Sequence, residues 1–327
     1  MKVLVTGSSG HLGEALVREQ REQGHEVASL DLRDGPFTSH VGSITDRTSV
    51  RRAMAGVAVV FHAATLHKPH LATHRPQEFV DTNVSGTLTL LEEALAAGAR
   101  AFIYTSTTSV FGTALVPPPG EPAVWVSEQL QPVPKNIYGV TKAAAEDLCQ
   151  MFQRQHPALP CVVLRTSRFF PEEDDSESIR AGYDALNAKV NELLFRRVDL
   201  ADVVAAHGLA AQRAATLGFT RYIISATTPF TRADLARLRH DAPAVLRRRV
   251  PQYEAEYARR GWRMFGAIDR VYDSERARRE LGWQPRYDFA FVLEQLRNGA
   301  HPTSTLARAV GSKGYHAQKF AGGPYPV

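Results

Sequence analysis

The chain has 327 residues, of which 44% are hydrophobic and 22% charged, so it can bury a substantial core as one large domain with a smaller lobe. Its net charge of +5 is spread over dispersed basic residues rather than a basic tract, and we expect no nucleic-acid partner. No run of 18 apolar residues is present, and Met1-Lys2 leads directly into the first apolar run, so we expect neither a membrane span nor a signal peptide. The two cysteines, Cys149 and Cys161, fall in a helical and a strand pattern, which predicts a reduced, cytoplasmic protein.

The first predicted unit is a strand, a glycine-rich turn and a helix. The apolar run Val3–Val5 precedes the turn, and a helical pattern at 14–23 follows it. The glycines of the turn are spaced every three residues: Gly7, Gly10 and Gly13. Such glycines permit a tight turn, backbone approach to a pyrophosphate and close packing of the helix on the strand. The helix N-terminus then offers free N–H groups and a positive dipole, which predicts a dinucleotide-binding unit.

The second predicted strand, at 26–30, ends in Asp31 and indicates which dinucleotide is bound. A carboxylate at this position accepts hydrogen bonds from both ribose hydroxyls and repels a 2′-phosphate, so we expect NAD rather than NADP. Arg33 could bind a 2′-phosphate, but with Asp31 in place a position near the adenine or in solvent is the preferred interpretation.

Further apolar runs at 58–62, 101–104 and 161–165 alternate with helical patterns, one of them long, at 76–98. This alternation predicts an α/β fold with a Rossmann-type, doubly wound parallel sheet. We expect a dinucleotide-binding domain over 1–166, with two returns to the sheet near 199–217 and 222–225. A mainly substrate-binding lobe is expected over 167–300, and an ordered or mobile tail over 301–327.

Tyr138 and Lys142 are the candidate proton-transfer residues, because they lie four residues apart on one face of a helix predicted to end near His156. A cation beside a phenol favours the phenolate, so Tyr138 could exchange a proton with a substrate hydroxyl. The predicted strand 101–104 runs into a cluster of hydroxyl side chains at 105–109. The carboxyl end of a strand in an open sheet faces the ligand crevice, which places these hydroxyls beside the proposed site.

Four histidines in one stretch suggest two alternatives, a metal site or a polar loop: His62, His67, His70 and His74. They lack a second ligand cluster, so the loop is the preferred interpretation and no metal is expected. Within that loop, His67 and Lys68 are candidates to contact the substrate.

Together these motifs resemble the extended short-chain dehydrogenases/reductases of the NAD-dependent epimerase/dehydratase family, typified by nucleotide-sugar 4-epimerases. The resemblance covers residue 1 to about 296. Its motifs recur in chain order: TGxxGxxG at 6–13, His-Ala-Ala at 62–64, Asn-Val-Ser-Gly-Thr at 83–87, Val-Phe-Gly at 110–112, the Tyr138/Lys142 pair, Val-Asp-Leu-Ala-Asp-Val at 198–203, and Asp273 through Leu-Gly-Trp-Gln-Pro at 281–285.

The resemblance implies that Thr107 hydrogen-bonds the reacting oxygen, that Tyr138 is the acid/base, and that Lys142 is its partner. It implies a larger set of cofactor-binding residues: Gly7, Gly10, His11, Leu12, Asp31, Arg33, Ser43, Ile44, Ala63, Ala64 and Asn83, together with Tyr138 and Lys142. In this set Ile44 would cover the adenine, and Asn83 would tie the strand network together. Ser43 stands where the family usually has an aspartate that binds the adenine amine. The family also forms homodimers through the two helices predicted at 76–98 and after Tyr138.

Departures from the family pattern concern the substrate. Thr107-Thr108-Ser109 replaces the Thr-Asp-Glu of the dehydratases, so elimination is not expected, and Thr108 becomes a substrate-contact candidate. Arg168 replaces an asparagine that contacts sugar-nucleotide phosphate, and the segment between Pro171 and Val198 lacks part of the nucleotide clamp. Arg168 could grip a carboxylate or phosphate, or it could pair with the acidic run 172–175 beside it.

Three functions follow. The first is an epimerase of carbohydrate metabolism that oxidises a secondary hydroxyl of a sugar or sugar-derived substrate through a keto intermediate. The second is a net NAD-dependent dehydrogenase or reductase of a free anionic sugar or hydroxy acid. The third is a catalytically silent NAD-sensing scaffold, which the intact Thr107, Tyr138 and Lys142 set disfavours.

Overall fold

The computed structural model describes residues 1–314, 316 and 320. Its centre is a seven-stranded parallel sheet in the order β3-β2-β1-β4-β5-β7-β8. The strands are β1 (Lys2–Thr6), β2 (Glu26–Asp31), β3 (His40–Val41), β4 (Val59–His62), β5 (Ala101–Thr107), β7 (Cys161–Thr166) and β8 (Phe219–Ile224). The predicted doubly wound sheet is confirmed, and the strand order reverses between β1 and β4, where open sheets of this kind bind ligands.

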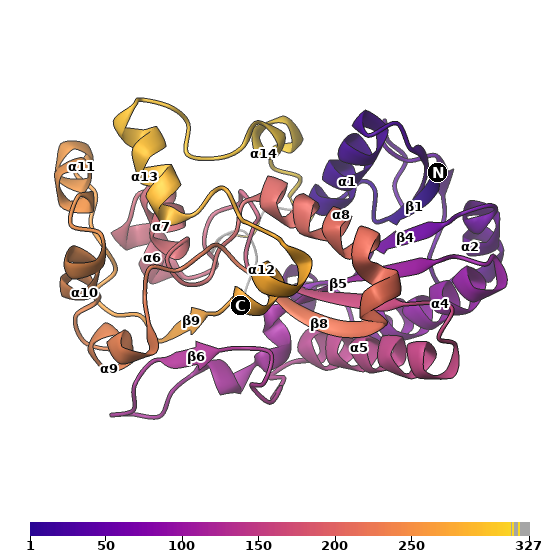
Figure 1. The fold of residues 1–327 in the computed structure, drawn as a ribbon, viewed down its shortest axis with the longest axis horizontal. Coiled ribbons are helices and arrows are strands. Elements are labelled where there is room, and N and C mark those ends of the chain that lie inside the picture. Colours follow the sequence, from indigo (N-terminus) through magenta and orange to yellow (C-terminus); the bar gives the residue numbers. More distant parts are fainter. Residues whose placement is uncertain (315, 317–319, 321–327) are drawn as a thin grey trace.

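Helices cover both faces of the sheet (Figure 1). On one face of the sheet, α1 (His11–Glu22) and α8 (Leu200–Leu217) share a core with the β1 side chains on that face, such as Val3 and Val5. On the other face α2 (Arg47–Met54), α4 (Gly86–Ala96) and α5 (Ile137–Gln155) pack over Leu4 and Leu30. Strands buried on both faces are apolar along their whole length, which explains why they could be recognised as short apolar runs.

The long helical pattern at 76–98 forms one nearly continuous helix with an irregular turn in it. It begins as α3 (Pro76–Phe79), continues as a π-helical turn, Val80–Ser85, and ends as α4. The π turn holds the buried Asn83. Such turns are rare and often occur at functional sites.

The second lobe has its own core around Leu194, Leu246 and Val292. Its elements are β6 (Val124–Val126), α6 (Glu177–Gly182), α7 (Ala185–Glu192), α9 (Leu235–Leu238), α10 (Ala242–Arg249), α11 (Tyr253–Arg260), β9 (Arg270–Tyr272) and α13 (Phe289–Arg297). Strand β6 pairs in parallel with β9, so a piece of the first 166 residues belongs to this lobe's small sheet.

Two expectations about the second half need correction. Of the two expected returns to the sheet, 219–224 is strand β8, but 200–217 is the helix α8 that covers the sheet, because its apolar residues recur at helical rather than alternating spacing. The expected substrate lobe is also interrupted, since α12 (Glu275–Leu281) and the buried Trp283 return to the core shared with α8 before α13 packs in the second lobe again. Helix α14 (Thr305–Val310), in the expected tail, packs in the core shared with α8 as well, so that part of the tail is ordered.

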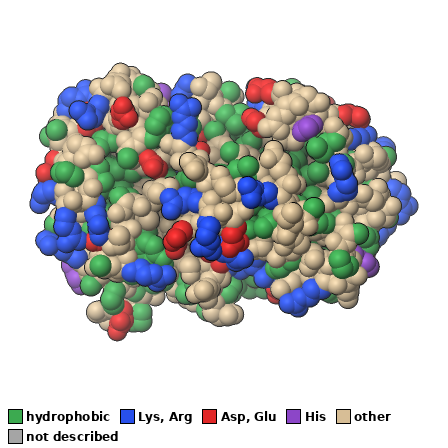
Figure 2. Space-filling model, viewed as in Figure 1, with side chains coloured by type: hydrophobic (Ala, Val, Ile, Leu, Met, Phe, Trp, Pro, Cys, Tyr) green, Lys and Arg blue, Asp and Glu red, His purple; other side chains and the backbone are tan. Residues whose placement is uncertain are grey.

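No helix in the described part of the chain is long and apolar enough to cross a membrane. Figure 2 shows Lys and Arg side chains scattered over the visible face, interspersed with acidic ones, rather than gathered in one basic patch.

Candidate active site

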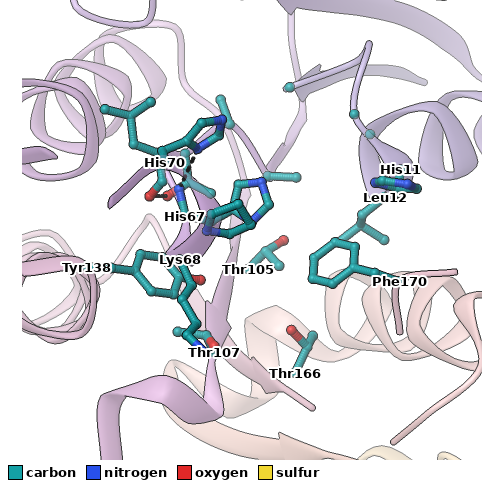
Figure 3. A pocket seen from close by; sticks show the side chains of 18 of the residues that line it. His11, Leu12, His67, Lys68, His70, Thr105, Thr107, Tyr138, Thr166 and Phe170 are labelled. Carbon is teal, nitrogen blue, oxygen red and sulfur yellow. Dashed lines mark hydrogen bonds between the residues drawn. The ribbon is translucent and has the colours of Figure 1, made fainter. Parts of the chain in front are cut away.

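A cavity of about 860 Å³ opens at the carboxyl ends of the parallel strands. It is lined by the glycine turn, the ends of β2, β4 and β5, the start of α5, and the segment 166–175. Figure 3 shows Tyr138, Lys68 and Thr107 on one side of this space, with His11, Leu12 and Phe170 across from them. The cavity therefore joins the predicted cofactor and catalytic residues in one site.

The glycine turn brings α1 against the end of β1 as closely as a backbone permits. Gly7 has φ +75°, and a Cβ there would lie 2.8 Å from the Ala64 nitrogen. A Cβ on Gly13 would lie 1.8 Å from the Gly7 carbonyl oxygen, which only glycine allows. The Gly10 N–H donates to the Gly7 carbonyl at 3.0 Å, whereas the next N–H groups, those of His11 and Leu12, have no partners within the helix, and both residues line the cavity. This cradle of bare backbone fits a pyrophosphate.

Asp31 is fixed by two backbone donors. Its Oδ2 accepts from the Ser9 N–H at 2.9 Å, and its Oδ1 accepts from the Arg33 N–H at 2.9 Å. Arg33 in turn donates to the Ser9 carbonyl at 3.3 Å, and both side chains line the cavity. Ser43 and Ile44 also line it, next to Asp31. These residues fit the adenosine half of a dinucleotide.

Ala63 and Ala64 line the cavity, whereas Asn83 is buried behind it and is not among the lining residues. Asn83 Oδ1 accepts from the Leu66 N–H at 2.8 Å, and its Nδ2 donates to the Leu66 carbonyl and to Thr141 Oγ1 at 2.9 and 3.0 Å. The expected direct cofactor contact of Asn83 is therefore corrected. The side chain ties the loop after β4 to helix α5, because its amide has no lone pair or N–H left to face the cavity.

Tyr138 and Lys142 lie one turn apart on α5, which the Asn136 side chain caps by accepting from the Gly139 N–H at 3.0 Å. Both side chains are buried and line the cavity together with Thr107 at the end of β5. Burial raises the pKa of Tyr138 to about 12, although a hydrogen bond to Thr107 opposes this shift. The structure thus brings the three predicted catalytic residues together.

The expected lowering of the Tyr138 pKa by Lys142 does not occur in this arrangement. Lys142 Nζ donates to the Thr105 carbonyl at 2.7 Å and lies 4.1 Å from the centre of the Tyr104 ring. Burial lowers the pKa of Lys142 itself to about 7, against the attraction of Glu146. Desolvation therefore keeps Tyr138 neutral near pH 7 and leaves Lys142 close to half-protonated there before any ligand is bound.

Arg168 lines the cavity, but its guanidinium is engaged by carboxylates. It donates to Asp174 at 2.5 Å, to Glu192 at 3.2 Å and to Asp175 at 3.3 Å. Of the two alternatives for Arg168, pairing with the acidic run is the one that the structure contains. Asp175 of this run also pairs with Lys68. Glu192, which lies outside the run, also pairs with Arg196 and Arg197. Burial opposes ionisation of Glu192, yet the Arg196 and Arg197 guanidiniums hold its pKa well below its usual range.

The remaining substrate-side candidates also line the cavity. His67 stacks on Phe170 with ring centres 5.6 Å apart, and burial holds its pKa well below the usual value. Thr108 is nearly buried. Among the described residues, no group of three or more His, Cys, Asp or Glu side chains is arranged to hold a metal ion.

Several lining residues were missed by the sequence analysis: Phe169, Phe170, Glu172, Arg196, Arg270, Tyr272, Lys313, Gly314 and His316. Arg270 and Tyr272 could have been found, since alternate residues of β9 share one face and both line the cavity. The other residues lie in loops, and no periodic sequence pattern predicts the position of a loop.

Comparison with known proteins decides the family. The model of the NAD dependent epimerase/dehydratase family matches residues 3–217, which is more than half of the chain. The chain belongs to this family. The sequence-based identification is confirmed, and the family's cofactor, NAD, fits the glycine cradle and Asp31 described above.

Two curated relatives show the range of the family. A 4-hydroxy-2-methyl-3-oxo-4-farnesyl-3,4-dihydroquinoline-1-oxide ketoreductase of Stigmatella aurantiaca is 30% identical over 341 residues, covering 91% of this chain and 96% of that protein. A UDP-glucose 4-epimerase of Erwinia amylovora is 29% identical over 211 residues, covering 59% of this chain and 60% of that protein. Two other matches cover only 36% and 32% of the relatives' lengths, so the chain spans less than two thirds of several curated relatives.

The fold also matches a solved structure with its cofactor. A short-chain dehydrogenase/reductase superfamily protein from Agrobacterium tumefaciens, with bound NAD, has a TM-score of 0.64 and 26% identity. The similarity covers 94% of this chain and 99% of that one. The family member described here therefore has the short-chain dehydrogenase/reductase fold over nearly its whole length.

Proposed function

We propose that the protein interconverts a secondary alcohol and a ketone with NAD(H), as a net reductase or dehydrogenase. The observation that carries this proposal is the convergence of Thr107, Tyr138 and Lys142 on the cavity that also contains the glycine cradle and Asp31. A hydroxyl, a phenol and an ammonium around one point suit proton exchange at a substrate oxygen, and a dinucleotide site beside them suits hydride exchange.

The cofactor, when bound, would accept or supply the hydride. Gly7, Gly10 and Leu12 would hold its pyrophosphate, and Asp31 its adenosine ribose. Tyr138 would give a proton to the substrate oxygen during reduction and take it back during oxidation. Thr107 would hydrogen-bond the same oxygen and orient it. Lys142, whose Nζ donates to the Thr105 carbonyl in the ligand-free protein, would stabilise the negative charge that develops on Tyr138.

The net reaction is favoured over epimerisation by the charge pairing on the substrate side. Four cations that line this side are already engaged: Lys68 by Asp175, Arg168 by Asp174 and Asp175, Arg196 by Glu192, and Arg270 by Asp269. A nucleoside diphosphate would have to compete with these carboxylates for the cations that could hold it. Phe169 and Phe170 add aromatic surface that a substrate without phosphates could cover. A relative named as a ketoreductase also matches over 91% of the chain.

Epimerisation of a sugar nucleotide through a keto intermediate is the second candidate, supported by relatives named UDP-glucose 4-epimerase that match over about half of the chain. It shares the first oxidation step and differs in whether NADH is retained and reoxidised within one turnover.

Two assays on the purified protein separate the candidates. NADH oxidation is followed at 340 nm with a panel of cyclic and quinone-type ketones, and UDP-glucose and UDP-galactose are separated by ion-exchange chromatography after incubation with NAD. Net consumption of NADH with a ketone, without interconversion of the UDP-sugars, is the expected result. Interconversion without net NADH would establish the epimerase instead. If neither occurs although NAD binds, the silent scaffold becomes the better description.

A further inference from the structure

The chain returns to the cavity after its last described helix. Helix α14 is anchored by Leu306, Ala307 and Val310, which pack in the core shared with α1 and α8. Gly311, with φ +62°, then ends the helix and turns the chain. Residues 312–314 and 316, called the C-terminal strap below, follow that turn, and Lys313, Gly314 and His316 line the cavity.

One carboxylate oxygen holds the first half of the strap. Glu172 Oε1 accepts from Ser312 Oγ at 2.8 Å, from the Lys313 N–H at 3.2 Å and from the Gly314 N–H at 3.3 Å. The same oxygen lies 2.8 Å from His11 Nε2, at the start of α1. Burial would raise the pKa of Glu172, but the hydrogen bonds from His11 and Ser312 bring it down to about 2. Glu172 is therefore ionised throughout the ordinary pH range and acts as the strap's latch.

Two further contacts fasten the strap to both sides of the cavity. Lys313 pairs with Glu14 in the first turn of α1. On the opposite side, His316 Nε2 donates to the Pro69 carbonyl at 2.9 Å, and its ring meets His70 edge-on at 5.7 Å between centres. Pro69 and His70 belong to the turn Lys68–Ala72 that follows β4. The strap thus spans from the pyrophosphate cradle at α1 to the loop beside the catalytic residues.

We propose that the C-terminal strap is part of the cofactor site, closes over the bound dinucleotide, and limits the rate at which the dinucleotide is exchanged. The proposal rests on the proposed function for the identity of that dinucleotide. A molecule lying between the start of α1 and the loop after β4 passes beneath the strap, because the strap is bonded to both. A net reductase must then open the strap in every turnover, since oxidised cofactor has to leave and NADH has to enter.

The charge of Glu172 allows a test with opposite expected signs. The Glu172 carboxylate faces the same cavity as the cofactor's phosphates. If the strap did not hold the cofactor, removing this carboxylate would weaken its repulsion of the phosphates and slow NADH release. Removing it from a site closed by the strap would free three hydrogen bonds of the latch and accelerate release. Faster NADH release from Glu172→Ala is therefore expected only if the strap closes the site.

The experiment measures the NADH dissociation rate of the full-length protein by stopped-flow fluorescence, with excess NAD as the displacing ligand. Glu172→Ala and Ser312→Asp are compared with Glu173→Ala, a neighbouring carboxylate that lines the cavity but is not a partner of Ser312, Lys313 or Gly314 in the hydrogen bonds given above. Ser312→Asp sets a carboxylate against Glu172 and repels the strap, although Ser312 itself does not line the cavity. We expect both strap variants to release NADH about tenfold faster than the wild type, with Glu173→Ala within about twofold of it.

A second readout follows the strap directly. Trypsin cleavage after Lys313, detected by mass spectrometry on the native protein, should slow about fivefold when NADH saturates the site, because cleavage requires the strap to open. Thermal unfolding of each variant shows whether the remainder of the fold is intact. If the wild type binds NADH but the strap variants release it no faster than Glu173→Ala, the strap proposal is overturned and the proposed function stands. If the wild type binds no NADH, both are overturned.

Discussion

Tyr138 has two proposed roles, proton transfer and contact with the cofactor, and removal of its hydroxyl tests them separately. We expect Tyr138→Phe to abolish turnover while NAD affinity stays within a few-fold, since only the phenolic hydroxyl is lost and the ring still fills its place on α5. Thr107→Ala should reduce kcat by about 100-fold, as does the loss of one donor to a reacting oxygen. Steady-state kinetics together with NAD titration calorimetry provide the measurement. Turnover of Tyr138→Phe at the wild-type rate would show that another group carries the proton.

Lys142 makes the stability of the ligand-free protein depend on pH. Burial lowers its pKa from 10.5 to about 7, so between about pH 7 and 10.5 the unfolded chain holds a proton that the folded protein does not. Stability therefore rises with pH across that window, and below pH 7 the folded protein bears the full cost of a buried ammonium.

We expect Lys142→Met to remove this dependence. The variant should be more stable than the wild type at pH 6, by an amount on the order of 1–3 kcal/mol, and the difference should shrink as the pH approaches 10. Urea unfolding of both proteins without cofactor, at pH 6, 8 and 10, gives the comparison. A difference that is constant over this range would mean that Lys142 is not desolvated in solution.

At the scale of elements, the contact between α1 and β1 depends on a glycine that has no room for one more carbon. A Cβ at Gly13 would lie 1.8 Å from the Gly7 carbonyl oxygen, so Gly13→Ala must push α1 away from the turn. We expect a loss of about 3 kcal/mol or more in unfolding free energy, together with loss of NAD binding.

The matched control is another helical glycine, Gly208 in α8, around which no described atom lies within 4 Å of a built Cβ. Gly208→Ala should stabilise the protein by about 0.5–1 kcal/mol, because alanine has the higher helix propensity. Denaturant unfolding of both variants measures the contrast. Equal effects of the two substitutions would show that α1 packs less closely than described.

The elements were predictable where their pattern is local. Short apolar runs identified β1, β2, β4, β5 and β7, because each is buried on both faces, and the glycine spacing identified the turn before α1, although the helix begins at His11 rather than at the expected residue 14. Helix α8 was misread as a return to the sheet although its buried residues, among them Val203, Ala206 and Ala210, recur at helical spacing. For Arg168 the sequence indicated pairing with the run 172–175 as one of two alternatives, but not its partner Glu192, which lies 24 residues away at the end of α7.

For the whole molecule, the face formed by α4 and α5 is the expected dimer interface. These helices pack side by side on one face of the sheet, and on α5 Val140 and Met151 are 48% and 39% exposed. We expect the wild type to elute at twice the chain mass of 36.0 kDa and the double variant Val140→Asp/Met151→Asp to elute as a monomer.

Val116→Asp serves as the control, because Val116 is 64% exposed but belongs to neither helix. Size-exclusion chromatography with light scattering distinguishes the species. A wild type of single-chain mass at micromolar concentration would refute the interface.

The arrangement of the lobes was only partly predictable, because it depends on contacts between distant segments. Residues 124–126 join the second lobe by pairing with β9, and 275–283 and 305–310 return to the first by packing in the core shared with α8. Neither contact has a signature within its own stretch of sequence. The family resemblance ends near residue 296 and therefore gave no indication that Lys313, Gly314 and His316 would line the cavity.

The π-helical turn at Val80–Ser85 determines where this helix could lose one residue without disturbing the core. A π turn accommodates one residue more than an α turn, so α3 and α4 are related as they would be in a regular helix shorter by one residue. A single deletion within this turn would leave Leu90 and Leu91 facing the core, whereas a deletion elsewhere in the helix would rotate them by about 100°. The damage would instead fall on Asn83, and through it on the loop after β4. A one-residue deletion in this turn would therefore preserve the packing of the helix but disturb the candidate active site.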